Sequence, residues 1–272
     1  MTKLSVNVNK IAVIRNSRGG NTPDVVAAAL AIERFGGEGI TVHPRPDARH
    51  IRYSDVRELK KVIKTELNIE GNPIGSFVDL VLEVVPAQVT LVPDAVDAIT
   101  SNAGWDTLAN REFLTDITKR FHEKGIRVSI FVDPKPEMVA GAAACGADRV
   151  ELYTEAYAAN YKADREAAIA PYIAAAEEAR KCGLGLNAGH DLSSSLIIPP
   201  SNKLISAIGS GFKGNRIAGN YNTSFIAYNS MCIYNTTAMG HSEVSAFVAI
   251  NPLPSRLICV IHVSLCTHIF LY

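Results

Sequence analysis

The sequence lacks net charge, paired cysteines and a leader segment, and each absence excludes a class of protein. Its 272 residues carry 27 basic and 27 acidic side chains, so no overall field attracts nucleic acid or a membrane surface. The five cysteines are an odd number without a Cys-x-x-Cys pair, and no charged-then-apolar signal segment opens the chain. These features favour a reducing cytoplasm. Any anion recognition must be local, and we expect no nucleic-acid partner, no membrane partner and no metal site.

Charge is also nearly absent from the end of the chain. The last 80 residues contain only five charged side chains: Lys203, Lys213, Arg216, Glu243 and Arg256. This stretch is rich in Ser, Asn, Ile and Gly and shows no long amphipathic period. We therefore predict a catalytic domain at 1–192 and an atypical low-charge tail at 193–272. A shifted reading frame, a retained non-coding stretch or a misassembled gene would explain such a tail.

The chain ends in an apolar run at 257–272, for which a membrane span is one interpretation. The run is short for a bilayer, contains His262 and His268, and has no flanking basic cluster. We interpret it instead as a misplaced or aggregation-prone segment.

The first 192 residues alternate between short β-rich runs and segments with apolar residues at three- and four-residue steps. The expected strands are 4–8, 39–43, 66–70, 88–92, 127–132, 149–153 and 183–187. The expected helices between them are 23–35, 54–64, 76–84, 107–124, 136–145 and 164–181. This alternation predicts an α/β fold in one domain, with a parallel sheet that is either open and doubly wound or closed into a (β/α)8 TIM barrel.

Polar residues at the strand ends favour the closed barrel. Nearly every predicted strand ends near groups that can bind a ligand or transfer a proton: Asn7, Asn9, His43, Arg45, Glu70, Asp133, Glu151, Thr154, Asn187 and His190. A barrel gathers the carboxyl ends of its strands into one mouth, whereas an open sheet spreads them along a crevice. No Gly-x-Gly-x-x-Gly motif follows the first strand, which argues against a dinucleotide site.

The segment from His43 to His50 holds two imidazoles and two guanidiniums in eight residues, directly after the second strand. Pro44 and Pro46 prevent that strand from continuing. His43 and Arg45 are two residues apart, so in an extended segment they point to the same side. A guanidinium fork suits phosphate oxygens, and an imidazole can transfer protons near neutral pH. The segment therefore predicts a phosphate-binding loop that also transfers protons, with solvated loop charges as the alternative.

Five motifs in order carry a resemblance to a known family. They lie at 6–19, 39–51, 68–71, 89–93 and 185–190. Over roughly the first 192 residues the chain resembles the pyridoxine 5'-phosphate synthase family. The resemblance implies a barrel with added helices, assembly into a homo-oligomer, usually an octamer, and no organic cofactor. It also implies condensation of 3-amino-2-oxopropyl phosphate with 1-deoxy-D-xylulose 5-phosphate to pyridoxine 5'-phosphate, with release of phosphate and water.

The resemblance also assigns roles to individual residues. The catalytic residues it implies are His43 as proton acceptor, Glu70 as acid/base and His190 as proton donor. The substrate-binding residues it implies are Asn7 and Arg18 for the amino-ketone phosphate, Asn9, Lys10, Arg45, His50 and Thr100 for deoxyxylulose phosphate, and Asp191 through its backbone. Lys10 stands where the family more often has His, and Asp191 where many members have Gly.

Other interpretations of these residues remain open. Glu70 would pair with a neighbouring Arg, His190 would be a structural hydrogen-bonding residue, and Asn7 and Asn9 would form turns. A barrel aldolase or isomerase acting on sugar phosphates would use Lys10 to form an imine. A non-catalytic scaffold would bind phosphate ligands without turnover.

The scaffold alternative arises because the eighth βα unit of the barrel is missing or unrecognisable. In the family this strand carries a Gly-His pair after a Val-Ser-Ile-like run, but here Met239-Gly-His241 precedes the strand-like run at 243–248. We interpret that match as a coincidence. The first and seventh strands should then expose unpaired edges, or tail residues should fill the gap between them.

Overall fold

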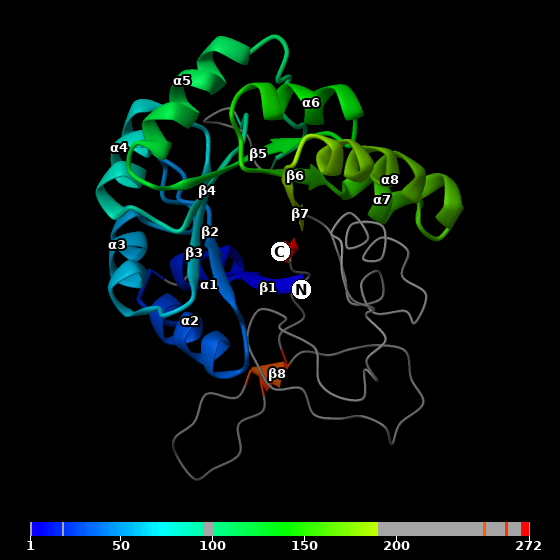
Figure 1. Ribbon diagram of the computed structural model, residues 1–272. Helices are drawn as coiled ribbons and strands as arrows, with labels where there is room; N and C mark the ends of the chain where they lie inside the picture. The colour runs from blue at the N-terminus through cyan, green and yellow to red at the C-terminus, as the bar shows by residue number, and fades with distance from the viewer. Residues whose placement is uncertain are drawn as a thin grey trace.

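The computed structural model describes residues 2–17, 19–94 and 101–189, together with three short strands at 247–248, 259–260 and 268–271. Seven parallel strands alternate with helices along the described chain (Figure 1). The strands are β1 (Thr2–Asn7), β2 (Gly39–Val42), β3 (Glu66–Gly71), β4 (Gln88–Leu91), β5 (Arg127–Val132), β6 (Arg149–Tyr153) and β7 (Gly185–Gly189). All seven were predicted, with ends that differ by up to two residues.

The helices lie outside the curved sheet (Figure 1). They are α1 (Asn9–Ser17), α2 (Val25–Arg34), α3 (Tyr53–Val62), α4 (Gly75–Val84), α5 (Arg111–His122), α6 (Pro136–Ala144), α7 (Glu155–Asn160) and α8 (Arg165–Lys181). The sequence predicted all of these except α1 and α7. Helix α1 contains the run Ile11-Ala-Val-Ile14, which shows no helical period, and α7 is only six residues long.

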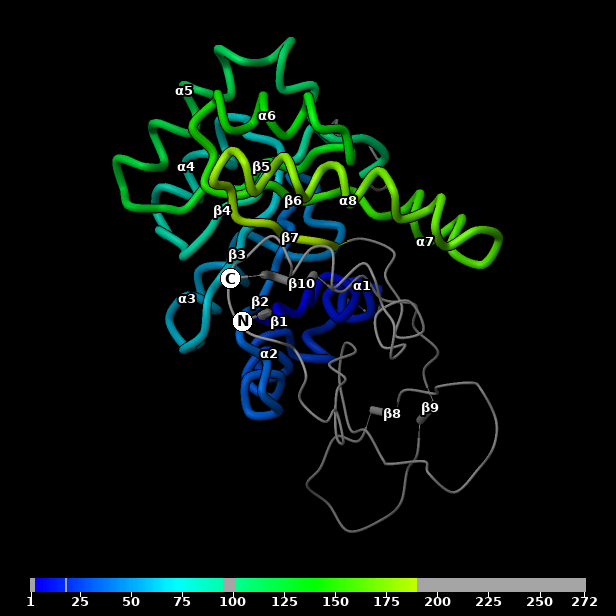
Figure 2. The backbone as a smooth tube through the Cα atoms, turned by 45° about the vertical axis from the view of Figure 1, so that its right-hand side comes forward, coloured from blue at the N-terminus to red at the C-terminus, as the bar shows by residue number. Residues whose placement is uncertain are grey.

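A strand from the end of the chain closes the barrel. The strand order is β1-β10-β7-β6-β5-β4-β3-β2, with β10 (His268–Leu271) antiparallel to both β1 and β7. Ile269 pairs with Leu4 on one side and with Ala188 on the other. Figure 2 shows β1 and β7, the two strands with which β10 pairs. The expectation that tail residues fill the gap is confirmed, and the eighth position holds an antiparallel strand in place of a βα unit.

The tail also contributes a separate two-stranded sheet. Strand β8 (Phe247–Val248) pairs antiparallel with β9 (Cys259–Val260). The Met239-Gly-His241 sequence lies outside the described residues, and Phe247 and Val248, the described part of the run after it, pair with β9 and not with a barrel strand. Within the described residues, no helix combines the length and apolarity that a membrane span requires.

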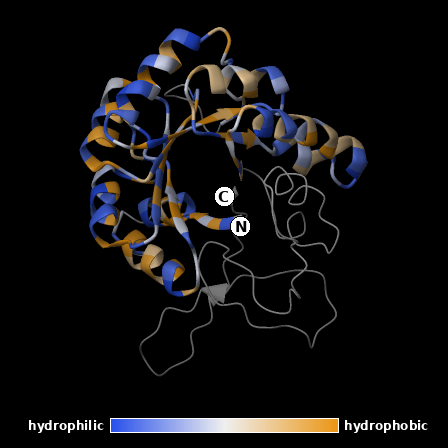
Figure 3. Cartoon of the chain, viewed as in Figure 1, coloured by the Kyte–Doolittle hydropathy of each residue, from blue (hydrophilic) through white to orange (hydrophobic). Residues whose placement is uncertain are grey.

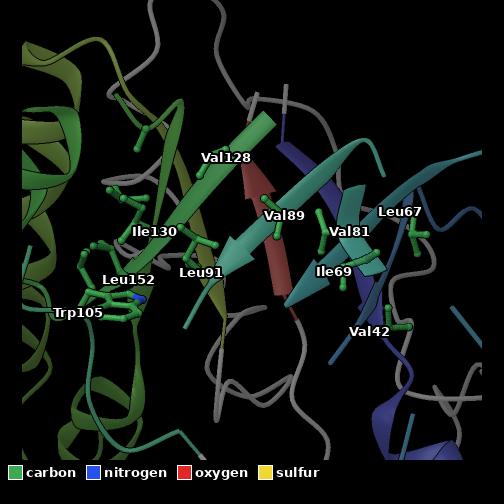
Figure 4. Close-up of a cluster of buried hydrophobic side chains, with 14 of the residues drawn as sticks. Val42, Leu67, Ile69, Val81, Val89, Leu91, Trp105, Val128, Ile130 and Leu152 are labelled. Carbon is green, nitrogen blue, oxygen red and sulfur yellow. The ribbon is translucent and has the colours of Figure 1, made fainter. Parts of the chain in front are cut away.

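Strands β1 to β7 each have an apolar face and a largely polar one. Leu67, Ile69, Val89 and Leu91 are buried in a cluster that includes Val81 of α4 (Figure 4). Polar side chains also occur on the strands, and the helices carry hydrophilic residues on their outer faces (Figure 3). The period of two along a strand places alternate residues on opposite faces, so the polar set faces the barrel interior.

Hydrogen bonds join this polar set from strand to strand. The Ser5 and Thr41 hydroxyl oxygens are 2.7 Å apart, and the Thr90 hydroxyl donates to Asn68 Oδ1 at 3.0 Å. Farther round the barrel, Asn187 Nδ2 donates to Ser129 Oγ at 3.2 Å. Buried polar groups need such partners, because an unsatisfied one costs free energy. The same face carries the polar residues of the barrel mouth.

Candidate active site

The mouth of the barrel holds a buried carboxylate beside an amide. Glu70, near the end of β3, is 5% exposed. The Nδ2 group of Asn7, the last residue of β1, donates to Glu70 Oε2 at 3.5 Å. Asn7 Oδ1 in turn accepts from the backbone N–H of Asn9 at 2.9 Å. Asn7 therefore connects Glu70 to the first residue of α1.

His43 stands next to Glu70 on the neighbouring strand. Val42 of β2 pairs with Ile69 of β3, so His43 and Glu70 occupy adjacent positions one residue farther along. Neighbouring strands lie about 5 Å apart, and the period of two along each strand directs the side chains of both residues toward the barrel interior. His43 is buried, and its backbone N–H donates to Asn9 Oδ1 at 2.8 Å. The structure thus brings two of the three predicted catalytic residues together.

Arg45 is held by an acidic residue that the sequence analysis missed. Its NH2 group lies 2.5 Å from Asp94 Oδ2, and both side chains are buried. The same Asp94 oxygen accepts from Ser101 Oγ at 2.8 Å, and the Asp94 carbonyl accepts from Asn72 Nδ2 at 2.8 Å. Asp94 follows β4 closely, so the rule applied to the other strand ends would have identified it.

A small pocket opens beside this ion pair. Its empty space, which is partly open to solvent, measures about 310 Å³, and its walls come from the segments that follow β2, β3 and β4 and from the start of α4. The lining residues are His43, Pro44, Arg45, Pro46, Asn72, Ile74, Phe77 and Asp94. The pocket combines a guanidinium with apolar walls, which suits a small ligand with one anionic group.

A buried ion pair fixes the loop between His43 and His50. Arg15 of α1 donates to both carboxylate oxygens of Asp55, at 2.6 and 2.8 Å, and to the His50 carbonyl at 3.0 Å. Asn16 donates to the same carbonyl at 2.8 Å and to that of Ala48 at 3.0 Å. Ala48 has a φ of 53°, which a residue with a side chain rarely adopts. Helix α1 therefore determines the path of the loop.

His50 is a neutral hydrogen-bonding group at neutral pH. Burial, reinforced by the charges of Arg45 and Arg49, lowers the pKa of His50 to about 4. Its Nδ1 accepts from the Ile51 backbone N–H at 2.9 Å, so the single ring proton is on Nε2. The charge of Lys10 also acts on His50 in this direction, which places Lys10 near the loop.

The remaining predicted site residues lie outside the described residues. These are Arg18, Thr100, His190 and Asp191. The described part of the chain does contain Asn7, Asn9, Lys10, His43, Arg45, His50 and Glu70, on the ends of three strands and on α1. No three His, Cys, Asp or Glu side chains gather to form a metal site within the ranges that the structure describes.

A TIM barrel with a carboxylate, imidazoles and a guanidinium at the carboxyl ends of its strands has the arrangement of a barrel enzyme's active site, with a cationic group suited to an anionic ligand. Comparison with known proteins specifies the family. A family profile described as pyridoxal phosphate biosynthesis protein PdxJ matches residues 4–208, so the chain belongs to this family.

Curated relatives agree with this assignment. The chain is 65% identical over 192 residues to pyridoxine 5'-phosphate synthase of Cytophaga hutchinsonii. It is 62% identical over 193 residues to the protein of the same name from Flavobacterium johnsoniae, and 65% identical over 193 residues to that from Phocaeicola vulgatus. Each comparison covers 71% of this chain and 81% of the relative. The predictions of the family and of an enzyme of vitamin B6 biosynthesis are confirmed.

Proposed function

We propose that this protein condenses 3-amino-2-oxopropyl phosphate with 1-deoxy-D-xylulose 5-phosphate to pyridoxine 5'-phosphate. The product agrees with the name of its curated relatives, pyridoxine 5'-phosphate synthase, and the two substrates are those that the sequence resemblance implies. The observation that carries the proposal is the adjacent placement of His43 and Glu70 at the barrel mouth, beside the Arg45 loop. Ring closure requires repeated proton transfers, and a carboxylate next to an imidazole can remove and return protons.

The reaction begins when the substrate amine adds to the ketone of deoxyxylulose phosphate and forms an imine. The first water is released as this imine forms, and enamine formation and elimination of phosphate follow. Attack of the resulting carbon on the second ketone closes the ring, and loss of the new hydroxyl as a second water makes the ring aromatic. His43 accepts a proton, Glu70 acts as acid and base, and His190 donates a proton. Holding both substrates in one mouth makes the condensation effectively intramolecular, which can account for much of the rate.

Two groups of residues bind the two phosphorylated substrates in this proposal. Asn7 and Arg18 bind the amino-ketone phosphate. The residues assigned to deoxyxylulose phosphate are Asn9, Lys10, Arg45, His50 and Thr100. His50 donates from Nε2 as a neutral group, since the pKa of its ring is about 4. Asp191 contributes its backbone N–H, so its side chain is compatible with binding.

Three further expectations belong to the proposal. The enzyme forms a homo-octamer, acts in the cytoplasm and needs no organic cofactor. The catalytic domain spans 1–192. The tail from 193 comes from a shifted reading frame, a retained non-coding stretch or a misassembled gene. The described tail strand β10 supports a structural use of that tail in closing the barrel.

The test is to mix both phosphorylated substrates with the purified protein and to measure pyridoxine 5'-phosphate by mass spectrometry. Product should form only when both substrates are present, and Glu70→Gln should abolish most of it. Absence of product from well-folded wild-type protein would refute the proposal. Borohydride treatment in the presence of substrate distinguishes this function from the aldolase alternative. An aldolase that forms an imine on Lys10 would leave that lysine covalently modified after reduction.

A further inference from the structure

The ion pair between Arg45 and Asp94 is buried on both sides. Arg45 is 5% exposed and Asp94 is 6% exposed, and their charged groups meet at 2.5 Å. Charged side chains are rarely this buried unless they are paired, because each loses its hydration. The pairing therefore holds the Arg45 guanidinium in one orientation at the edge of the pocket.

Asp94 is itself fixed from two directions. Ser101 Oγ donates to the same carboxylate oxygen that Arg45 contacts, at 2.8 Å. Asn72 Nδ2 donates to the Asp94 backbone carbonyl at 2.8 Å. Asn72 lies in the turn after β3 and holds the backbone of Asp94, whereas Ser101 follows β4 and holds its carboxylate. Asp94 is therefore anchored independently of Arg45. An anchored carboxylate can impose its geometry on the guanidinium.

The orientation of Arg45 matters because a guanidinium binds phosphate through specific pairs of N–H groups. With one N–H directed at Asp94, the rotation of the planar group about its side chain is fixed. Asp94 also balances the charge of Arg45, and the nearby His50 is neutral at neutral pH. Phosphate binding at this point therefore depends on where the Arg45 donors point more than on net positive charge.

We propose that Asp94 is a positioning residue for phosphate recognition, acting through Arg45, with Ser101 as its support. The proposal rests on the proposed function for the identity of the substrate, deoxyxylulose phosphate, whose phosphate Arg45 holds. It adds two residues, Asp94 and Ser101, to the set that determines affinity for that substrate.

Steady-state kinetics of Asp94→Ala test the proposal. The KM for deoxyxylulose phosphate should rise by roughly tenfold or more, the scale of a lost charge-assisted hydrogen bond. The KM for the amino-ketone phosphate should stay close to that of the wild type. Ser101→Ala should raise the first KM by a smaller factor. Glu83→Ala, which removes an exposed ion pair with Arg57, is the control and should change neither KM.

A double-mutant cycle separates positioning from general destabilisation. If Asp94 acts through Arg45, Asp94→Ala should change the KM for deoxyxylulose phosphate little in an Arg45→Ala background. Equal effects of Asp94→Ala in both backgrounds, or equal effects on both substrates, would overturn the proposal. Asp94→Asn keeps the shape of the side chain and should change the same KM in the same direction, so it replaces Asp94→Ala if that variant fails to fold.

Binding of inorganic phosphate, measured by calorimetry, provides a readout without turnover. Wild-type protein should bind phosphate roughly tenfold more tightly than Asp94→Asn or Asp94→Ala. If the wild type binds phosphate more tightly than the variants but forms no pyridoxine 5'-phosphate, the proposed function fails and the role of Asp94 stands. If folded variants bind phosphate as tightly as the wild type, or the wild type binds none, the role of Asp94 is refuted.

Discussion

The imidazole rings of His43 and His50 meet edge to face, with centroids 6.0 Å apart. A backbone bridge between Pro44 and Ile51 brings the two ends of the loop together, so residues seven apart in sequence become neighbours. Burial and two guanidiniums keep His50 neutral, with a pKa of about 4. The pair therefore gains no charge from His50 near neutral pH, and a proton accepted in the reaction is expected on His43.

The low pKa of His50 predicts a pH dependence of stability. The folded state holds the His50 proton less tightly than the unfolded state, whose value is near 6.5. The resulting stability is fully present above pH 6.5 and is lost as the pH falls toward 4, by up to about 3 kcal/mol. Urea unfolding of wild type and His50→Asn between pH 4 and 8 measures it.

In that comparison, the asparagine oxygen can replace Nδ1 as the acceptor for Ile51 but does not titrate. The free energy of unfolding of His50→Asn should therefore change less between pH 6.5 and 4. Parallel curves for the two proteins throughout this window would contradict the assignment.

Glu70→Gln should lose turnover while the fold is retained. Glutamine keeps the shape and can still accept from Asn7, but it cannot take up a proton. The loss in kcat should lie in the range of about 10²–10⁴, which is typical of removing a general acid or base. Thermal unfolding of the variant should stay near that of the wild type. Near-normal turnover would mean that Glu70 has only a structural role.

The Arg15–Asp55 pair should be costly to break. Arg15→Met leaves the Asp55 carboxylate buried without its guanidinium, and such changes typically cost about 3–5 kcal/mol. The exposed Arg57–Glu83 pair has equally short contacts, but Arg57→Met should cost less than about 1 kcal/mol. Urea unfolding of both variants provides the measurement. Similar costs for the two would show that burial does not determine the strength of these pairs.

The closing strand β10 should be necessary for a stable barrel. Ile269→Pro removes a backbone N–H between β1 and β7, and without this strand both neighbours expose unpaired edges. Soluble yield and melting temperature should fall. Val260→Pro, in the separate two-stranded sheet, is the matched control and should have a smaller effect.

A family-like C-terminal segment in place of residues 193–272 offers a complementary test. A parallel eighth strand with its own helix should give higher soluble yield and turnover than the tail of this chain. Equal behaviour of the two proteins would show that the tail replaces the eighth unit fully.

Local sequence patterns were sufficient for most of the fold. The strand at 66–71 and the helix at 75–84 follow from a β-rich run and an apolar period, because backbone preference and side-chain burial there agree. Helix α1 was missed because its run Ile11-Ala-Val-Ile14 suits a strand equally well. It forms a helix where β1 ends and the Asn7 side chain accepts from the backbone of Asn9.

The sequence by itself determined the alternation of strands and helices, the polar strand ends and the loop from His43 to His50. These depend on residue type and spacing over a few positions. Only the tertiary structure decided that Asp94 contacts Arg45, that Arg15 fixes the loop through Asp55, and that residues 268–271 close the barrel. Such contacts join residues 40 or more positions apart, and no local preference encodes which distant partner a side chain meets once the chain is packed.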